Sequence, residues 1–137
     1  MIMYKTIGQW EKLNPFVNAV VSADTLKGAV GKVEDGVFTV DAKGAYAVMA
    51  VEVGDDMCMD EYKIPANTPV RVLDLAKVNG MSVQIYGAQL PATFAVGDKL
   101  ESDASGVLVT GASAAPYFEV TKIVGNKTGV EATVVAQ

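Results

Sequence analysis

The side chains best suited to chemistry, a group of carboxylates, are close in sequence, between residues 52 and 61. Carboxylate oxygens of this kind suit hard cations such as Ca²⁺. The spacing lacks the glycine-centred loop of an EF-hand, so we interpret the segment as a solvated acidic loop and expect no bound metal. The cluster consists of Glu52, Asp55, Asp56, Asp60 and Glu61.

The single cysteine, Cys58, lies within this acidic segment. Negative neighbours disfavour the thiolate form that a nucleophile needs, and one cysteine cannot form an intramolecular disulfide. The chain contains no histidine, which removes the commonest general base and excludes Ser-His-Asp and Cys-His catalysis. We assign no catalytic residue and expect no enzyme activity.

Two further motifs could point to a cofactor. Gly28-Ala29-Val30-Gly31-Lys32 has the glycines and lysine of a loose phosphate-binding loop, but the spacing is too short and no Ser or Thr follows the lysine. Met57-Cys58-Met59 is similar to the Met-Lys-Met turn of biotin- and lipoate-carrying barrels, but a cysteine replaces the lysine that would be modified. We therefore expect no cofactor.

Composition narrows the possible partners. The 137 residues fit one domain, and a hydrophobic fraction of 50% leaves surplus apolar surface that usually finds a partner. A net charge of −5, with basic residues scattered singly, argues against nucleic-acid binding.

No apolar run approaches the roughly 20 residues of a membrane span. The N-terminus lacks the pattern of a secretory signal, so we expect synthesis in a cytoplasm.

Short β-branched runs between turn signals predict an all-β fold, a small barrel or sandwich of antiparallel strands. Asp35-Gly36 predicts a two-residue hairpin turn. Asn79-Gly80 predicts a second hairpin, with residues 70–72 on one arm and the alternating residues 81–86 on the other. The apolar run 45–53 is compatible with a buried helix, but its valines favour a strand covered on both faces.

The chain also contains a possible internal sequence repeat, in which one order of turn residues and apolar runs occurs twice. Ala29-Val30-Gly31-Lys32-Val33-Glu34, followed by Asp35-Gly36, returns as Ala95-Val96-Gly97-Asp98-Lys99-Leu100-Glu101, followed by Asp103 and Gly106. Tyr46 and Tyr117 occupy corresponding places. Within one β domain over 1–137 we therefore expect a first β-unit at 29–64 and a second at 70–137. A proline-rich connection joins them, and an irregular N-terminal arm precedes them at 1–28, with helical turns at 9–13 and 22–27.

Three aromatic residues lie in this N-terminal segment: Tyr4, Trp10 and Phe16. Aromatic side chains are common anchors at protein interfaces. They are therefore our candidate partner-binding residues, although they could equally close the open end of their own barrel. Tyr46 and Tyr117 suggest a shared packing role.

The last third of the chain resembles the head decoration, or cement, proteins of tailed bacteriophages. The resemblance rests on Phe94-Ala95-Val96-Gly97-Asp98-Lys99-Leu100, on Asp103-Ala104-Ser105-Gly106-Val107-Leu108, and on a closing strand at 130–135. It implies a compact β-protein, often trimeric, that binds the outside of a viral shell and secures junctions between major capsid subunits.

We therefore expect a non-enzymatic virion protein on the capsid exterior, a homotrimer whose partner is the major capsid protein. The alternative is a carbohydrate- or cell-surface-binding β-module in which Trp10 and exposed tyrosines stack on sugars. An enzymatic function would require the acidic cluster to hold a metal ion.

Overall fold

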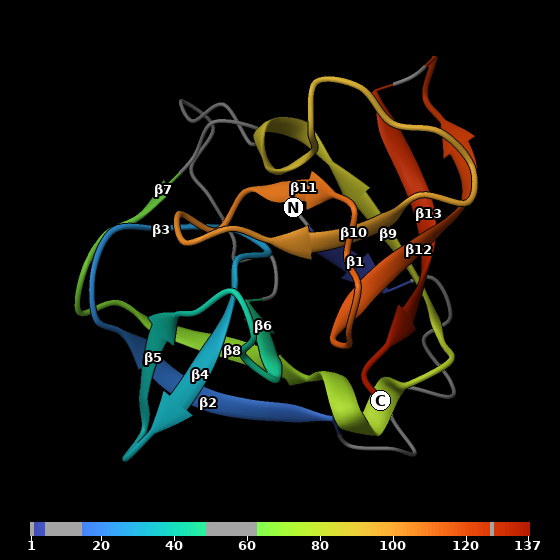
Figure 1. Ribbon diagram of the computed structural model, residues 1–137. Coiled ribbons are helices and arrows are strands. Elements are labelled where there is room, and N and C mark those ends of the chain that lie inside the picture. The colour runs from blue at the N-terminus through green and yellow to red at the C-terminus, as the bar shows by residue number, and fades with distance from the viewer. Residues whose placement is uncertain (1, 5–14, 49–62, 127) are drawn as a thin grey trace.

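A computed structural model describes residues 2–4, 15–48, 63–126 and 128–137. These residues form two β-layers, a closed five-stranded barrel and an open six-stranded sheet, together with a small two-stranded sheet. Figure 1 shows the barrel below and the six-stranded sheet above it. The expected all-β fold is confirmed.

The barrel takes its strands from the first half of the chain. They are β2 (Phe16–Val21), β4 (Val30–Glu34), β5 (Val37–Val40), β6 (Tyr46–Val48) and β8 (Pro69–Asp74). The order around the barrel is β2-β5-β4-β6-β8. All pairs are antiparallel except the parallel pair of β2 and β5. The two-stranded sheet, β3 (Thr25–Leu26) and β7 (Lys63–Ile64), accompanies the barrel.

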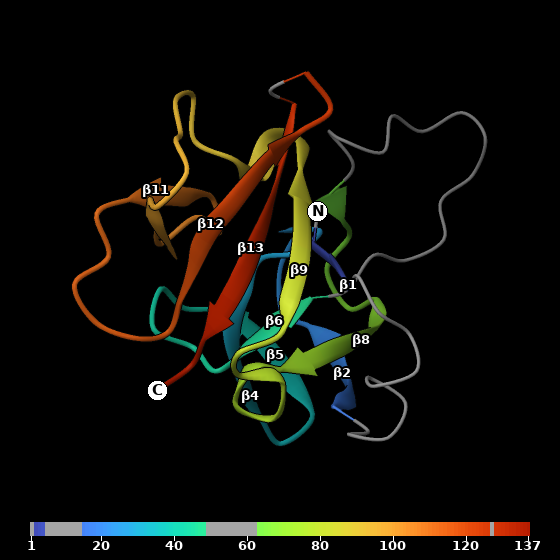
Figure 2. The ribbon, with the colours of Figure 1, turned by 90° about the vertical axis from the view of Figure 1, so that its right-hand side faces the viewer.

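The open sheet has the order β1-β9-β13-β12-β10-β11. Its strands are β1 (Ile2–Tyr4), β9 (Ser82–Tyr86), β10 (Lys99–Ser102), β11 (Leu108–Thr110), β12 (Tyr117–Val124) and β13 (Gly129–Val135). Each neighbouring pair is antiparallel. Figure 2 shows β12, β13 and β9 side by side, with β11 and β1 toward opposite sides. Two short 3₁₀ helices, η1 (Leu75–Val78) and η2 (Gly87–Gln89), flank β9 in the chain.

Two hydrophobic cores hold the layers. The first lies inside the barrel and includes Phe38, Val21 and Val72, all fully buried. The second joins barrel residues such as Leu73 and Ala47 to sheet residues such as Val83. Alternate side chains of a strand point to opposite faces, so β8 can place Val72 in one core and Leu73 in the other. This arrangement makes the barrel wall one side of the core that covers the sheet.

The predicted hairpin at Asp35-Gly36 is confirmed. Glu34 pairs with Val37 across the turn, and Asp35 and Gly36 have φ values of 51° and 77°, as a tight hairpin turn with the right twist requires. The expected strand at 45–53 is confirmed over Tyr46–Val48, and the remainder lies outside the described residues.

The predicted hairpin at Asn79-Gly80 is wrong. β8 pairs with β2 and β6 in the barrel, whereas β9 pairs with β1 and β13 in the sheet. Between them, Asp74 caps η1 by accepting a hydrogen bond from the Ala76 N–H at 3.1 Å. Gly80 does turn the chain, with φ 83°, but it leads from one layer into the other.

The expected irregular arm at 1–28 also needs correction where the structure describes it. Residues 16–21 form barrel strand β2, with Ala19 and Val21 buried, because small and β-branched side chains alternate there toward the barrel interior. Within the segment 22–27, where a helical turn was expected, Thr25–Leu26 form strand β3. The turn expected at 9–13 lies outside the described residues.

The two segments of the possible sequence repeat, which begin at Ala29 and Ala95, have the same local strand order. β4 lies between β5 and β6, and β10 lies between β11 and β12; Tyr46 and Tyr117 begin the third strand of each group. The expected second unit at 70–137 does not coincide with the six-stranded sheet, however, because its first strand, β8, closes the barrel.

Candidate partner-binding surface

The structure places the three predicted aromatic residues unequally. Tyr4 ends β1 and pairs with Val83 of β9 in the open sheet. Phe16 begins β2 in the barrel, so these two residues belong to different layers. Trp10 lies outside the described residues. A single aromatic patch from Tyr4 and Phe16 therefore has no support in the strand pairing.

Phe16 is half-buried and packs against the core between the layers. The Arg71 guanidinium carbon lies 5.6 Å from the centre of the Phe16 ring, within the range of a cation–π contact. Arg71 is exposed on β8, so its side chain covers part of the ring. Phe16 therefore packs between the two layers and is not part of the core inside the barrel.

The segment from Phe94 to Leu108 contains a turn at 95–98 whose backbone is fixed by hydrogen bonds. The Asp98 carboxylate accepts a hydrogen bond from the Ala95 N–H at 2.8 Å, and the Gly97 N–H donates to the Val120 carbonyl at 2.8 Å. Gly97 has φ 93°, which favours glycine. Val96, at the tip, is 62% exposed. The turn therefore presents an apolar side chain on a fixed backbone.

The hairpin between β10 and β11 is fixed by Asp103. Its carboxylate accepts hydrogen bonds from the Ser105 hydroxyl at 2.7 Å, the Ser105 N–H at 2.8 Å and the Val107 N–H at 3.1 Å. The Ser105 hydroxyl bond is the largest cause that holds the pKa of Asp103 below its ordinary value of 3.8, and the backbone bonds add to it against an opposing effect of burial. The ionised carboxylate thus organises the turn.

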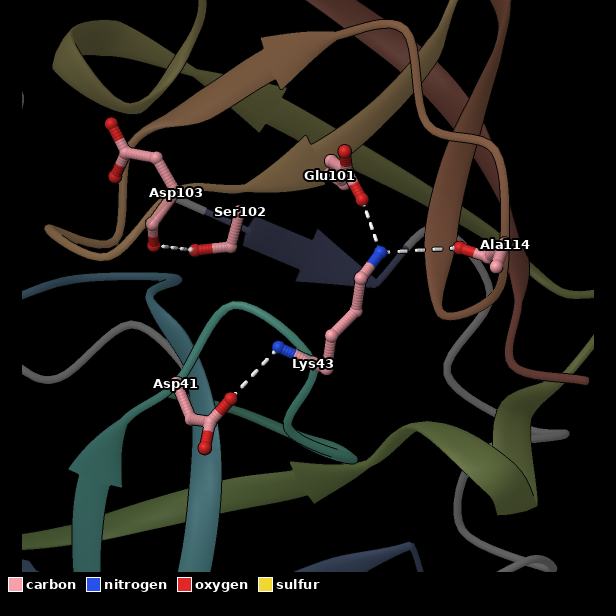
Figure 3. A network of polar contacts seen from close by, with 6 residues as sticks. All are labelled: Asp41, Lys43, Glu101, Ser102, Asp103 and Ala114. Atoms are coloured by element: carbon pink, nitrogen blue, oxygen red, sulfur yellow. Dashed lines mark hydrogen bonds and ion pairs between the residues drawn. The ribbon is translucent and has the colours of Figure 1, made fainter.

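An ion pair joins this hairpin to the barrel (Figure 3). Lys43, in the loop between β5 and β6, pairs with Glu101 of β10 and also lies 3.4 Å from the Ala114 carbonyl. The Lys43 N–H donates to the Asp41 carboxylate at 2.9 Å, which orders the loop. Beside this contact, the Ser102 hydroxyl donates to the Asp103 carbonyl at 3.0 Å.

Two buried contacts strengthen the connection between the layers. The Gln89 side-chain amide, 1% exposed, donates to the Gly28 carbonyl. At Gly106, a Cβ would lie 3.0 Å from the Cβ of Ala29, so the hairpin turn touches the barrel directly. The described part of the sheet is therefore held to the barrel at several separate points.

Little in the described residues suggests bound-metal chemistry. They contain no group of three Asp, Glu or Cys side chains placed to hold a metal ion. The acidic cluster at 52–61 and Cys58 lie outside the described residues.

Among the described segments, no helix has the length and apolar character needed to cross a membrane. No protein-family model matches the chain, and comparison with curated proteins gives no match.

Sequence reasoning missed the most exposed apolar positions of the second half. Val96 lies in the turn at 95–98, and Val109 is 38% exposed on β11, but neither was singled out. Exposure of Val96 could have been inferred from its place between Ala95 and Gly97 in a turn. The position of Val109 depends on strand order, for which the sequence carries no local signal.

Proposed function

We propose that this protein is a non-enzymatic structural virion protein, a homotrimer that binds the outer surface of a phage capsid and stabilises contacts between major capsid subunits. The observation that carries the proposal is the architecture of the segment from Phe94 to Leu108. Its turns are fixed by Asp98 and Asp103, and it is tied to the barrel through Glu101.

Such a braced segment suits adhesion. A rigid contact surface loses little conformational entropy when it binds, so more of the interaction energy appears as affinity. Val96 and Val109 give the segment exposed apolar side chains, which contribute by leaving water. An interface of standard size buries about 800 Å² on each partner, and three such surfaces on a trimer would add avidity without any single strong site.

The net charge of −5 agrees with an exterior position. A protein that lined the inside of the shell would face packaged DNA, whose phosphates repel negative charge. The carbohydrate-binding alternative has less support among the described tyrosines. Tyr46 packs against the barrel core, and the Lys99 ammonium lies 5.2 Å from the centre of the Tyr117 ring.

The test is binding to expanded, DNA-free heads of tailed phages that lack their own decoration protein. We expect the purified protein to co-sediment with heads and to raise their melting temperature. Val96→Asp should weaken binding, because it places a charge where an apolar contact is expected, while Val37→Asp, at an exposed position on the barrel, should not. Failure to bind any expanded shell, or glycan binding that is lost in Trp10→Ala, would contradict the proposal.

A further inference from the structure

Among the residues that the structure describes, the six-stranded sheet ends in two edge strands, β1 and β11, each of which pairs with a strand on one side. An edge strand presents free N–H and C=O groups that another strand can pair with, and proteins usually protect such edges with charges, prolines or bulges. Neither edge has this protection in its sequence: β1 is Ile-Met-Tyr and β11 is Leu-Val-Thr. The uncharged, proline-free stretch around β11 extends from Ala104 to Ala115.

The hydrogen bonds of the hairpin show which groups of β11 point outward. Asp103 bonds to Val107, and Gly111 bonds to Lys99, so the alternation of an antiparallel ladder makes Val109 the residue bonded to β10. Leu108 and Thr110 therefore direct their N–H and C=O groups away from the sheet. This edge offers two donors and two acceptors.

The same reasoning applies to β1. The Val134 N–H donates to the Met81 carbonyl at 2.9 Å, so Val83 and Ile85 bond to β13, and Gln84 bonds to Met3. The outward backbone groups of β1 are then those of residues 2 and 4. In each edge strand, the two residues whose backbone groups point outward are separated by one residue that bonds inward. β1 and β11 also have the same length, three residues.

Strand direction matches as well. Because six strands alternate in an antiparallel sheet, β1 and β11 run in opposite directions. If copies of the chain are arranged in the same sense around an axis that follows the strands, β11 of one copy meets β1 of the next in antiparallel orientation, the more stable kind of pairing. Two different patches that meet in this way form a heterologous interface, which closes into a ring when the rotation fits.

We propose that the chain assembles into a cyclic homo-oligomer in which β11 of each copy pairs with β1 of the next and continues the sheet. The occupant of the β11 edge is thus a second copy. The absence of charge in both strands avoids like-charge repulsion at the junction, and Val109 gains a neighbour that covers its exposed side chain. Only the number of copies, three, rests on the proposed function.

Proline substitutions test each edge separately. Thr110→Pro removes an outward N–H and leaves the bonds between β10 and β11, and proline is tolerated at such edge positions. Tyr4→Pro does the same for β1. Native mass spectrometry and sedimentation over a concentration series should show a ring for the wild type and for Thr110→Val, and monomers for each proline variant. A wild type that stays monomeric, or a ring that persists in either proline variant, would overturn the proposal.

Mixing the two variants gives the decisive result. Thr110→Pro retains a functional β1 edge and Tyr4→Pro retains a functional β11 edge, so a mixture can form one junction. We expect a heterodimer and no ring. A twofold pairing of β11 with β11 would instead leave Tyr4→Pro dimeric, and a mixture that remains monomeric would show that these edges do not pair; both results would refute the proposal.

A charge substitution tests the β11 edge without proline, in case the proline variants fail to fold. Val109→Lys places a charge at the β11 edge and should also give monomers. Val37→Lys is the matched control, because Val37 is 41% exposed and Val109 is 38% exposed, but β5 has neighbours on both sides in the closed barrel. Circular dichroism should show the same fold for both. A ring of another number would support the pairing and contradict the trimer, and shell binding is measured separately.

Discussion

Contact between the hairpin turn and the barrel can be tested at Gly106. An alanine there adopts the glycine φ of 88°, which costs an L-residue about 1–2 kcal/mol. Its Cβ would also lie 3.0 Å from the Cβ of Ala29, and such overpacking adds about 1 kcal/mol or more. We therefore expect Gly106→Ala to lower the free energy of unfolding by about 2–3 kcal/mol.

The matched control is Gly36→Ala. Gly36 has φ 77°, and a Cβ there would meet nothing within 4 Å. This variant should lose only the backbone contribution, about 1–2 kcal/mol. Urea unfolding followed by circular dichroism measures both variants, and the midpoint should shift without a change in slope.

A double-mutant cycle isolates the contact itself. Ala29→Gly removes the methyl group that the new side chain of Gly106→Ala would meet, so the double variant should be more stable than the sum of the single losses predicts, by about 1 kcal/mol. Equal losses in Gly106→Ala and Gly36→Ala, together with strict additivity in the cycle, would refute the packing of this turn against the barrel.

Three further predictions follow from the described contacts. Because its native pKa is lowered, Asp103 contributes stability that is present above its ordinary pKa of 3.8 and is lost as pH falls through the native value; acid titration of unfolding should show a weaker pH dependence in Asp103→Asn. Phe38→Ala, at a fully buried position, should cost about 3–5 kcal/mol in urea unfolding, whereas the half-buried Phe16 should cost clearly less. Lys43→Met breaks the ion pair with Glu101 and should cost at most about 1 kcal/mol, an effect that added salt reduces in the wild type.

The sequence was sufficient for the fold class and for turns whose signal is local. Asp35-Gly36 joins two strands that pair with each other, so a pattern of a few residues contains the whole hairpin. Asn79-Gly80 has an equally good turn signal, but it connects strands of different layers. Which sheet a strand enters depends on partners far away in the chain, such as Val134 for Gly80.

The candidate site was harder for the same reason. Tyr4 and Phe16 are close in sequence, yet their strands enter different layers. Lys43 and Glu101 are 58 positions apart, and nothing in either neighbourhood indicates that they meet. The open edge at β11 is likewise a property of strand order, since its residues have the composition of any buried strand.

The closed barrel has a practical consequence for the hairpin of β4 and β5. Its tip, at Asp35 and Gly36, points away from the six-stranded sheet in both views (Figures 1 and 2), and a Cβ at Gly36 would meet open space. Foreign peptides inserted at this tip would extend into solvent without touching either edge of the sheet. The molecule therefore offers an attachment point for antigens or affinity tags.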